Sequence, residues 1–275
     1  MERGMRTEGV IKMNVLFFGS LVLYFVALAL QFAAAAFKKE GLGKTAWYIF
    51  LGGLAMQTVY LAVRGIIAHR IPLSNQFEFA TTFAWGVAVL LVILRLRLKT
   101  DWLNVIAMPM TFFILSYAAL QPREITDLMP ALRSGWFAFH IGSAVISYSS
   151  FIVAGCIGLR YILLHKKKNE EDAFKLQQMD YLSYRLVALG VLMLTVTILT
   201  GAIWAEQAWS AFWTWDPKEV WALITWIIYV VYLHLRLRGK KQGIRMAWYV
   251  VIAVPVVLFT FAGVNTLMSG LHSYG

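Results

Sequence analysis

The 275-residue sequence has few charged residues and a single cysteine. Only 14% of its residues are charged, whereas 60% are hydrophobic, which leaves too little polar surface for a soluble domain of this length. The lone Cys156 excludes an intramolecular disulfide, and it lies in an apolar run where helix packing is its expected role. The sequence also lacks a C-x-x-C-H motif, so the chain does not attach heme covalently by that route. These absences indicate an integral membrane protein.

Eight apolar stretches are long enough to cross a membrane as helices, because a span needs about 20 mostly apolar residues. No Gly/Ser-rich linker, change in composition or internal repeat divides the chain, so we expect one membrane domain over residues 1–275. The predicted fold class is all-α, a polytopic membrane protein of about eight transmembrane helices. The expected helices cover residues 13–36, 44–66, 78–96, 103–120, 136–164, 184–205, 217–236 and 246–270.

The net charge of +11 comes from basic clusters between the apolar stretches. This pattern is typical of cytoplasmic loops and argues against nucleic-acid binding. Of the 25 lysines and arginines, 17 follow the odd-numbered helices and eight lie on the other side. We therefore expect both termini, and the connection between the sixth and seventh helices, on the outer side. The first stretch also resembles a signal peptide, but its apolar core is longer than is typical of one.

That sixth connection is rich in tryptophan. Six of the chain's 11 tryptophans fall within residues 204–226, more than an interfacial aromatic belt easily explains. Asp216 and Pro217 predict a helix N-cap and first turn, and Lys218 and Glu219 a solvated continuation of that turn. Either an aromatic belt before a capped helix or a flat apolar shelf for a planar macrocycle fits the pattern. The aromatic segment comprises Trp204, Trp209, Trp213, Trp215 and Trp221, with Asp216.

Two histidines are expected at the membrane level of this segment. His140 lies one turn inside the outer end of the fifth helix, and His272 lies just past the eighth. Two neutral imidazoles, one on each face, commonly hold heme iron. Ser143 and Ser147 share a helix face with His140, which suits close helix contact or a lined pocket.

His234 lies at the other end of the seventh helix. Trp215 is 19 residues away, which corresponds to roughly 28 Å of helix at about 1.5 Å per residue. One heme cannot reach both ends, so His234 as a ligand implies a second, inner site. From the residues alone, a histidine among snorkelling arginines is the favoured interpretation.

One acid stands at the expected start of the third helix. Glu78 is stabilised there by the helix dipole. Arg64 or Arg70 is placed to pair with it or to meet an acidic edge of a ligand.

The run WTWDPKEVWALITWIIYVVYLHLR resembles the WWD signature of heme-handling proteins of cytochrome c maturation. Its D-P-K-E-x-W-x-L-I-T-W continuation is similar to the CcsA/ResC family of the system II pathway. Two further stretches agree with this family, PLSNQFEF before the third helix and GVNTLMSGLHSYG at the C-terminus. The resemblance covers residues 72–275 in order.

This resemblance implies a function. Proteins of this family work with a ResB/CcsB-like membrane partner and present heme b for attachment to apocytochrome c, as one subunit of a cytochrome c synthase that is not active alone. Matched residue by residue, the outer axial pair falls on His140 and His272, the membrane histidine on His234, and the WWD segment on residues 204–221. The implied location is a bacterial cytoplasmic membrane or a thylakoid-type membrane.

Three alternatives remain: a CcmC-like heme-loading protein, a transporter without heme chemistry and a purely structural membrane subunit. A CcmC-like heme-loading protein also has a WWD segment and two outer histidines, but it usually has fewer helices. A transporter without heme chemistry would carry ionisable groups within its spans or a matched pair of Pro/Gly-broken helices, and this sequence shows few of the first and none of the second. A colourless preparation from heme-replete cells would favour a protein without heme chemistry.

Overall fold

The computed structural model describes residues 2–166 and 173–268, and this part of the chain is helical, with no β-strand. Eight of its helices are long and apolar enough to cross a membrane, which confirms the predicted all-α fold class. The chain forms two compact units, Met1–Asp127 and Leu128–Gly275. That the two units function as one membrane domain stays a prediction.

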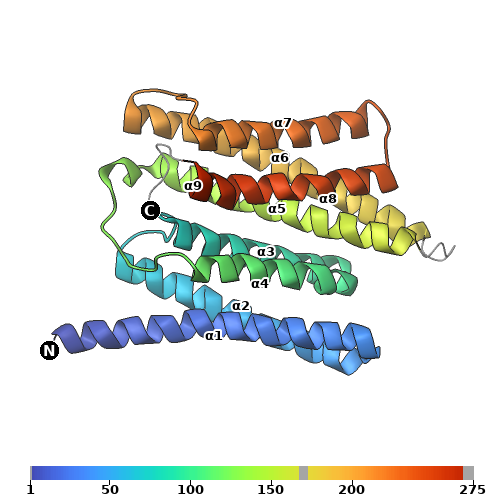
Figure 1. The fold of residues 1–275 in the computed structure, drawn as a ribbon, viewed down its shortest axis with the longest axis horizontal. Coiled ribbons are helices and arrows are strands. Elements are labelled where there is room, and N and C mark those ends of the chain that lie inside the picture. The colour runs from blue at the N-terminus through green and yellow to red at the C-terminus, as the bar shows by residue number, and fades with distance from the viewer. Residues whose placement is uncertain (1, 167–172, 269–275) are drawn as a thin grey trace. The chain divides into compact units, whose positions relative to one another are not determined.

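The first unit contains four long helices, α1 (Glu2–Phe37), α2 (Glu40–Ala68), α3 (Gln76–Leu98) and α4 (Asn104–Ala119), with a short 3₁₀ turn, η1 (Asp101–Leu103). Helix α1 packs along α2 and α4, and α3 packs along α4 (Figure 1). Aromatic side chains fill its core, because the Phe17 ring lies 5.5 Å from Tyr60 and 5.1 Å from Phe77.

A buried ion network closes one end of this unit. The Glu78 carboxylate accepts hydrogen bonds from Arg64 Nε at 2.9 Å and from Arg70 at 2.7 Å, so both predicted partners pair with it. Arg64 is 1% exposed and also donates to the backbone carbonyls of Arg123 and Glu124. The network therefore holds the chain that follows α4 against α2 and α3.

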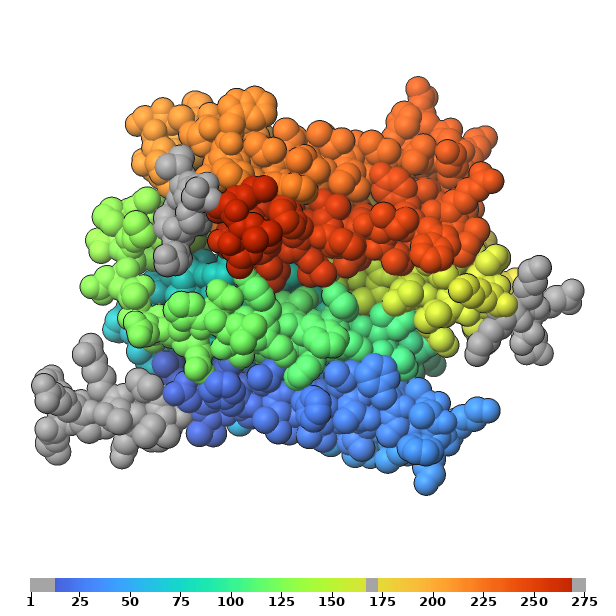
Figure 2. Space-filling model, viewed as in Figure 1, coloured from blue at the N-terminus to red at the C-terminus, as the bar shows by residue number. Residues whose placement is uncertain are grey.

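The second unit is built around α5 (Gly135–His165). A 3₁₀ turn, η2 (Pro130–Leu132), precedes α5, and α6 (Ala173–Trp209), α7 (Pro217–Leu237) and α8 (Ile244–Leu258) follow it. Helix α5 packs against both α6 and α8, and its residues from 143 to 158 are all buried apart from Ile146. Figure 2 shows α8 lying against α7 on one face of this unit.

Small residues on α5 allow this close packing. A Cβ added to Gly155 would lie 2.2 Å from a methyl of Val254, and one added to Gly158 would lie 2.5 Å from a methyl of Val250. Ser147 donates across the α5–α6 contact to the Gly190 carbonyl at 2.8 Å. The polar face predicted around His140 is thus a helix contact.

Three helix boundaries differ from the sequence prediction. Helix α1 begins at Glu2 and α6 extends over Ala173–Trp209, because hydropathy marks the span that crosses the bilayer while the helix continues through polar residues. The last span is interrupted by a π-helical turn, η4 (Phe259–Gly263), before α9 (Val264–Leu267). Pro255 lies one turn before η4, and a proline cannot donate the regular backbone bond.

The ion network leads to a stability prediction. Glu78→Ala leaves the buried Arg64 without its carboxylate, which typically costs about 3–5 kcal/mol. We therefore expect a clearly lower midpoint of thermal unfolding in detergent. Asp101→Asn is the matched control, because the Asp101 carboxylate that pairs with Arg95 is 63% exposed and such pairs contribute less than about 1 kcal/mol. Equal midpoints for the two variants would contradict this role of Glu78.

Candidate functional site

The connection between α6 and α7 is shorter than the predicted aromatic loop. Helix α6 ends at Trp209 and α7 begins at Pro217, so only residues 210–216 are non-helical. Trp204 and Trp209 belong to α6, and Trp221 belongs to α7. Only Trp213 and Trp215 lie in the loop itself. The sequence prediction made the loop longer because the indole-rich helix ends carry too few charges for hydropathy to separate them from a loop.

A capping box fixes this loop at the start of α7. Asp216 is the N-cap and accepts from the Lys218 backbone at 2.9 Å, with Pro217 in the first turn, as the sequence predicts. Glu219 is not the solvated residue that we expected, because its carboxylate accepts from the backbone N–H groups of Asp216 at 3.2 Å and Thr214 at 2.8 Å. The D-P-K-E motif is thus a reciprocal cap that holds the loop backbone.

The loop presents large aromatic side chains at the surface. Trp215 is 72% exposed and Phe212 is 62% exposed. The rings of Trp213 and Trp215 meet edge to face with their centroids 5.8 Å apart, and Trp215 has a left-handed φ of 59°. A strained, non-glycine residue that exposes an indole suggests a binding surface.

His140 lies half-buried against α6. Its Nδ1 is 2.8 Å from the Thr197 carbonyl oxygen. A carbonyl only accepts, so Nδ1 carries a proton in this contact, and in the neutral imidazole the lone pair is then on Nε2. Neutral imidazole in this tautomer, supported through its second nitrogen, is the form that ligates metals.

Trp204 supports the histidine from the interior. It is 1% exposed, its ring lies nearly parallel to His140 with centroids 5.9 Å apart, and its indole N–H donates to the Ala131 carbonyl at 2.7 Å. Trp209 packs edge-on against it at 4.7 Å. These two tryptophans connect the loop to His140 rather than extend its exposed surface.

Trp221 connects the loop to the end of α8. Its ring contacts Phe259 in the π-helical turn at 4.4 Å. One turn further along α7, Thr225 forms a 2.8 Å hydrogen bond with Thr260 in the same turn. The α7 start and the π-helical turn are therefore held together at two levels.

His234 lies far along α7 from the loop, as predicted, and its side chain is exposed. Ile227 and Val231, which share its helix face at spacings of seven and three residues, are 48% and 42% exposed. This face of α7 is therefore partly exposed.

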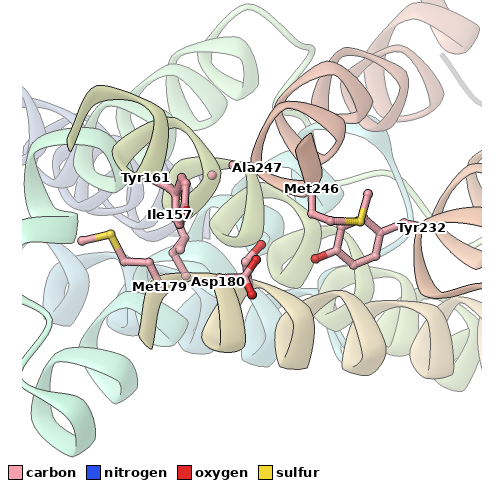
Figure 3. Close-up of a pocket in the computed structure, with 9 residues that line it drawn as sticks. Ile157, Tyr161, Met179, Asp180, Tyr232, Met246 and Ala247 are labelled. Carbon is pink, nitrogen blue, oxygen red and sulfur yellow. The ribbon is translucent and has the colours of Figure 1, made fainter. Parts of the chain in front are cut away.

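A small cavity lies near the same end of α7, between α5, α6, α7 and α8 (Figure 3). Asp180 and Tyr232 line it, and the Asp180 carboxylate accepts from Arg236 and from the Gly243 backbone. Its volume is about 10 Å³, which is enough for about one water and far too little for a porphyrin. An inner heme at His234 would therefore lie outside this cavity.

The remaining candidates fall into two groups. His272 lies outside the described residues, so its position relative to His140 stays a prediction. His69 caps α2 with a left-handed φ of 51°, and His165 stacks on Tyr161 at 5.8 Å. Nowhere along residues 2–166 and 173–268 do three His, Cys, Asp or Glu side chains gather as a metal site.

The sequence analysis did not predict the α6 residues that contact the His140 ring. Thr197 and Gly201 belong to the middle of α6, and no motif marks them. A glycine one turn after a threonine within an apolar span is a weak signal of close helix contact. The contact with His140 becomes visible only once α5 is packed against α6.

The capping box gives a second prediction. Asp216→Ala removes the cap and costs about 1 kcal/mol, while Asp216→Asn retains an accepting side chain. We expect the alanine variant to increase proteolysis at residues 210–216 in detergent and the asparagine variant to resemble the wild type. Identical cleavage rates in all three proteins would contradict the cap.

Comparison with known proteins identifies the family. The family model described as "Cytochrome C assembly protein" matches residues 73–272. "Cytochrome c biogenesis protein CcsA" of Guillardia theta is 32% identical over 93% of this chain and 92% of its own length, and that of Porphyra purpurea is 30% identical over 94% and 95%. The solved structure of "Cytochrome c Heme Lyase CcmF" shares the fold, with a TM-score of 0.74 at 12% identity over 96% of this chain, which spans about half (47%) of that longer chain. This chain belongs to the cytochrome c assembly protein family, with CcsA proteins among its relatives.

Proposed function

We propose that the chain handles heme for cytochrome c assembly, as a membrane subunit of a system II synthase. The observation that carries this proposal is the His140 imidazole, whose Nδ1 contacts the Thr197 carbonyl on α6, the helix that leads into the loop where Trp215 is exposed. Family membership supports the same pathway. We expect activity only in complex with a ResB/CcsB-like partner.

In this proposal heme b is the cargo. His140 and His272 bind its iron from opposite faces, and the loop aromatics Trp213 and Trp215 lie along the porphyrin. Trp204, Trp209 and Trp221 support the site from the helices, and Asp216 fixes the loop. The protein positions the heme and tunes its iron, while the bonds form between heme and apocytochrome c. Each cysteine thiol adds its sulfur and its proton across a heme vinyl double bond.

His234 belongs to an inner site in this proposal. Its exposed position on a partly apolar helix face supports a second ligand from the partner subunit rather than from this unit. The distribution of basic residues supports both termini and the tryptophan loop on the outer side of a bacterial cytoplasmic or thylakoid-type membrane.

Removal of His140 tests the outer site. In the complex purified with its partner, His140→Ala is expected to lower the heme bound at the outer site at least about tenfold, because the loss even of a group that only supports a metal ligand costs about 10–100-fold in affinity. Free imidazole is expected to restore part of the heme and of the Soret band. His165→Ala, at the far end of α5, is the matched control. Unchanged heme content and Soret position in His140→Ala would refute ligation by His140.

Cysteine labelling tests the orientation. In a Cys156→Ala background, a membrane-impermeant maleimide added outside intact cells is expected to label Phe212→Cys and not Lys240→Cys. Both positions are exposed, so permeabilised cells should show labelling of both. Outer labelling at position 240 alone would reverse the proposed topology.

A further inference from the structure

We infer that α6 contains a cradle of positioning residues, Thr197, Gly201 and Trp204, that sets the orientation and the donor strength of His140. The inference rests on the proposed heme function. The three positions are spaced four and three residues apart, so they lie on one face of α6, and all three are adjacent to the His140 ring.

The first element is the Thr197 carbonyl. A carbonyl oxygen has two lone pairs, so it can accept from His140 Nδ1 in addition to its helical bond. A hydrogen bond that withdraws the Nδ1 proton increases the electron density at Nε2 and makes it a stronger donor. A stronger donor stabilises ferric over ferrous iron and lowers the reduction potential.

The second element is the space at Gly201. A Cβ added here would lie 2.6 Å from His140 Nδ1 and 2.7 Å from Cε1, which is closer than side-chain carbons approach one another. An alanine would therefore push the ring away from the Thr197 carbonyl. Gly142, which lies two residues after His140 on α5, has open space around an added Cβ.

The third element limits where a displaced ring can go. Trp204 stacks along the imidazole, and its own indole is held by the Ala131 carbonyl. Ser143 donates to the His140 carbonyl at 3.0 Å and bonds the Thr197 hydroxyl at 2.8 Å, so the register of α5 on α6 is fixed at this level. The Thr197 carbonyl, the Gly201 backbone and the Trp204 ring therefore hold the His140 ring in one position.

The test compares Gly201→Ala with Gly142→Ala in the complex purified with its partner. We expect Gly201→Ala to raise the heme midpoint potential, with about a tenfold change in the ferric-to-ferrous affinity ratio, or about 59 mV for one electron. Its heme content should fall and recover partly with free imidazole. Gly142→Ala should keep the wild-type potential and content.

The outcomes separate this inference from the proposed function. If His140→Ala loses heme while Gly201→Ala matches Gly142→Ala in potential and content, the cradle is wrong and the proposed function stands. If His140→Ala keeps the wild-type heme content and Soret position, ligation by His140 fails, and with it the outer heme site of the proposed function. Should Gly201→Ala not accumulate in the membrane, Trp204→Leu is measured instead, and a wild-type potential in that variant overturns the inference.

Discussion

The hydrogen bond from His140 Nδ1 to the Thr197 carbonyl joins the start of α5 to α6, the helix that leads into the tryptophan loop. It forms only because two spans approach very closely, and that approach depends on Gly201 and on the serines of α5. In a bilayer core, such contacts between small residues hold helices together where hydrophobic burial contributes little. The same packing that stabilises the second unit therefore also determines which imidazole nitrogen of His140 bonds to α6.

The tryptophans of α6 and of the loop that follows it have two roles. Trp204 is buried beneath His140, whereas Trp215 is exposed on a backbone that the capping box holds. A surface indole on a flexible loop would cost conformational entropy on binding. Asp216 and Glu219 reduce that cost by fixing the loop before the ligand arrives. In the first unit, the buried Arg64–Glu78 pair holds the chain after α4 in a comparable way.

The spans could be predicted from the sequence because crossing a bilayer requires a length of apolar chain that few other structures need. Helix ends could not, since α6 continues through polar residues to Ala173 and through indoles to Trp209. The N-cap at Asp216 and the first turn at Pro217 could be predicted, because local chemistry marks them. Thr197 and Gly201 were missed because their role exists only across a helix pair, and Glu219 was misjudged because its partner Thr214 is brought close only when the loop folds back.

The central claim is that His140 is an axial ligand of the heme iron. The near-infrared charge-transfer band of ferric heme, recorded by magnetic circular dichroism, reports the identity of the axial pair directly. It is measured in the complex purified with its partner, for the wild-type chain and for His140→Met. The account predicts a bis-imidazole band in the wild type and a shift to an imidazole–thioether band in the variant. A band at the same position in both proteins would contradict ligation by His140.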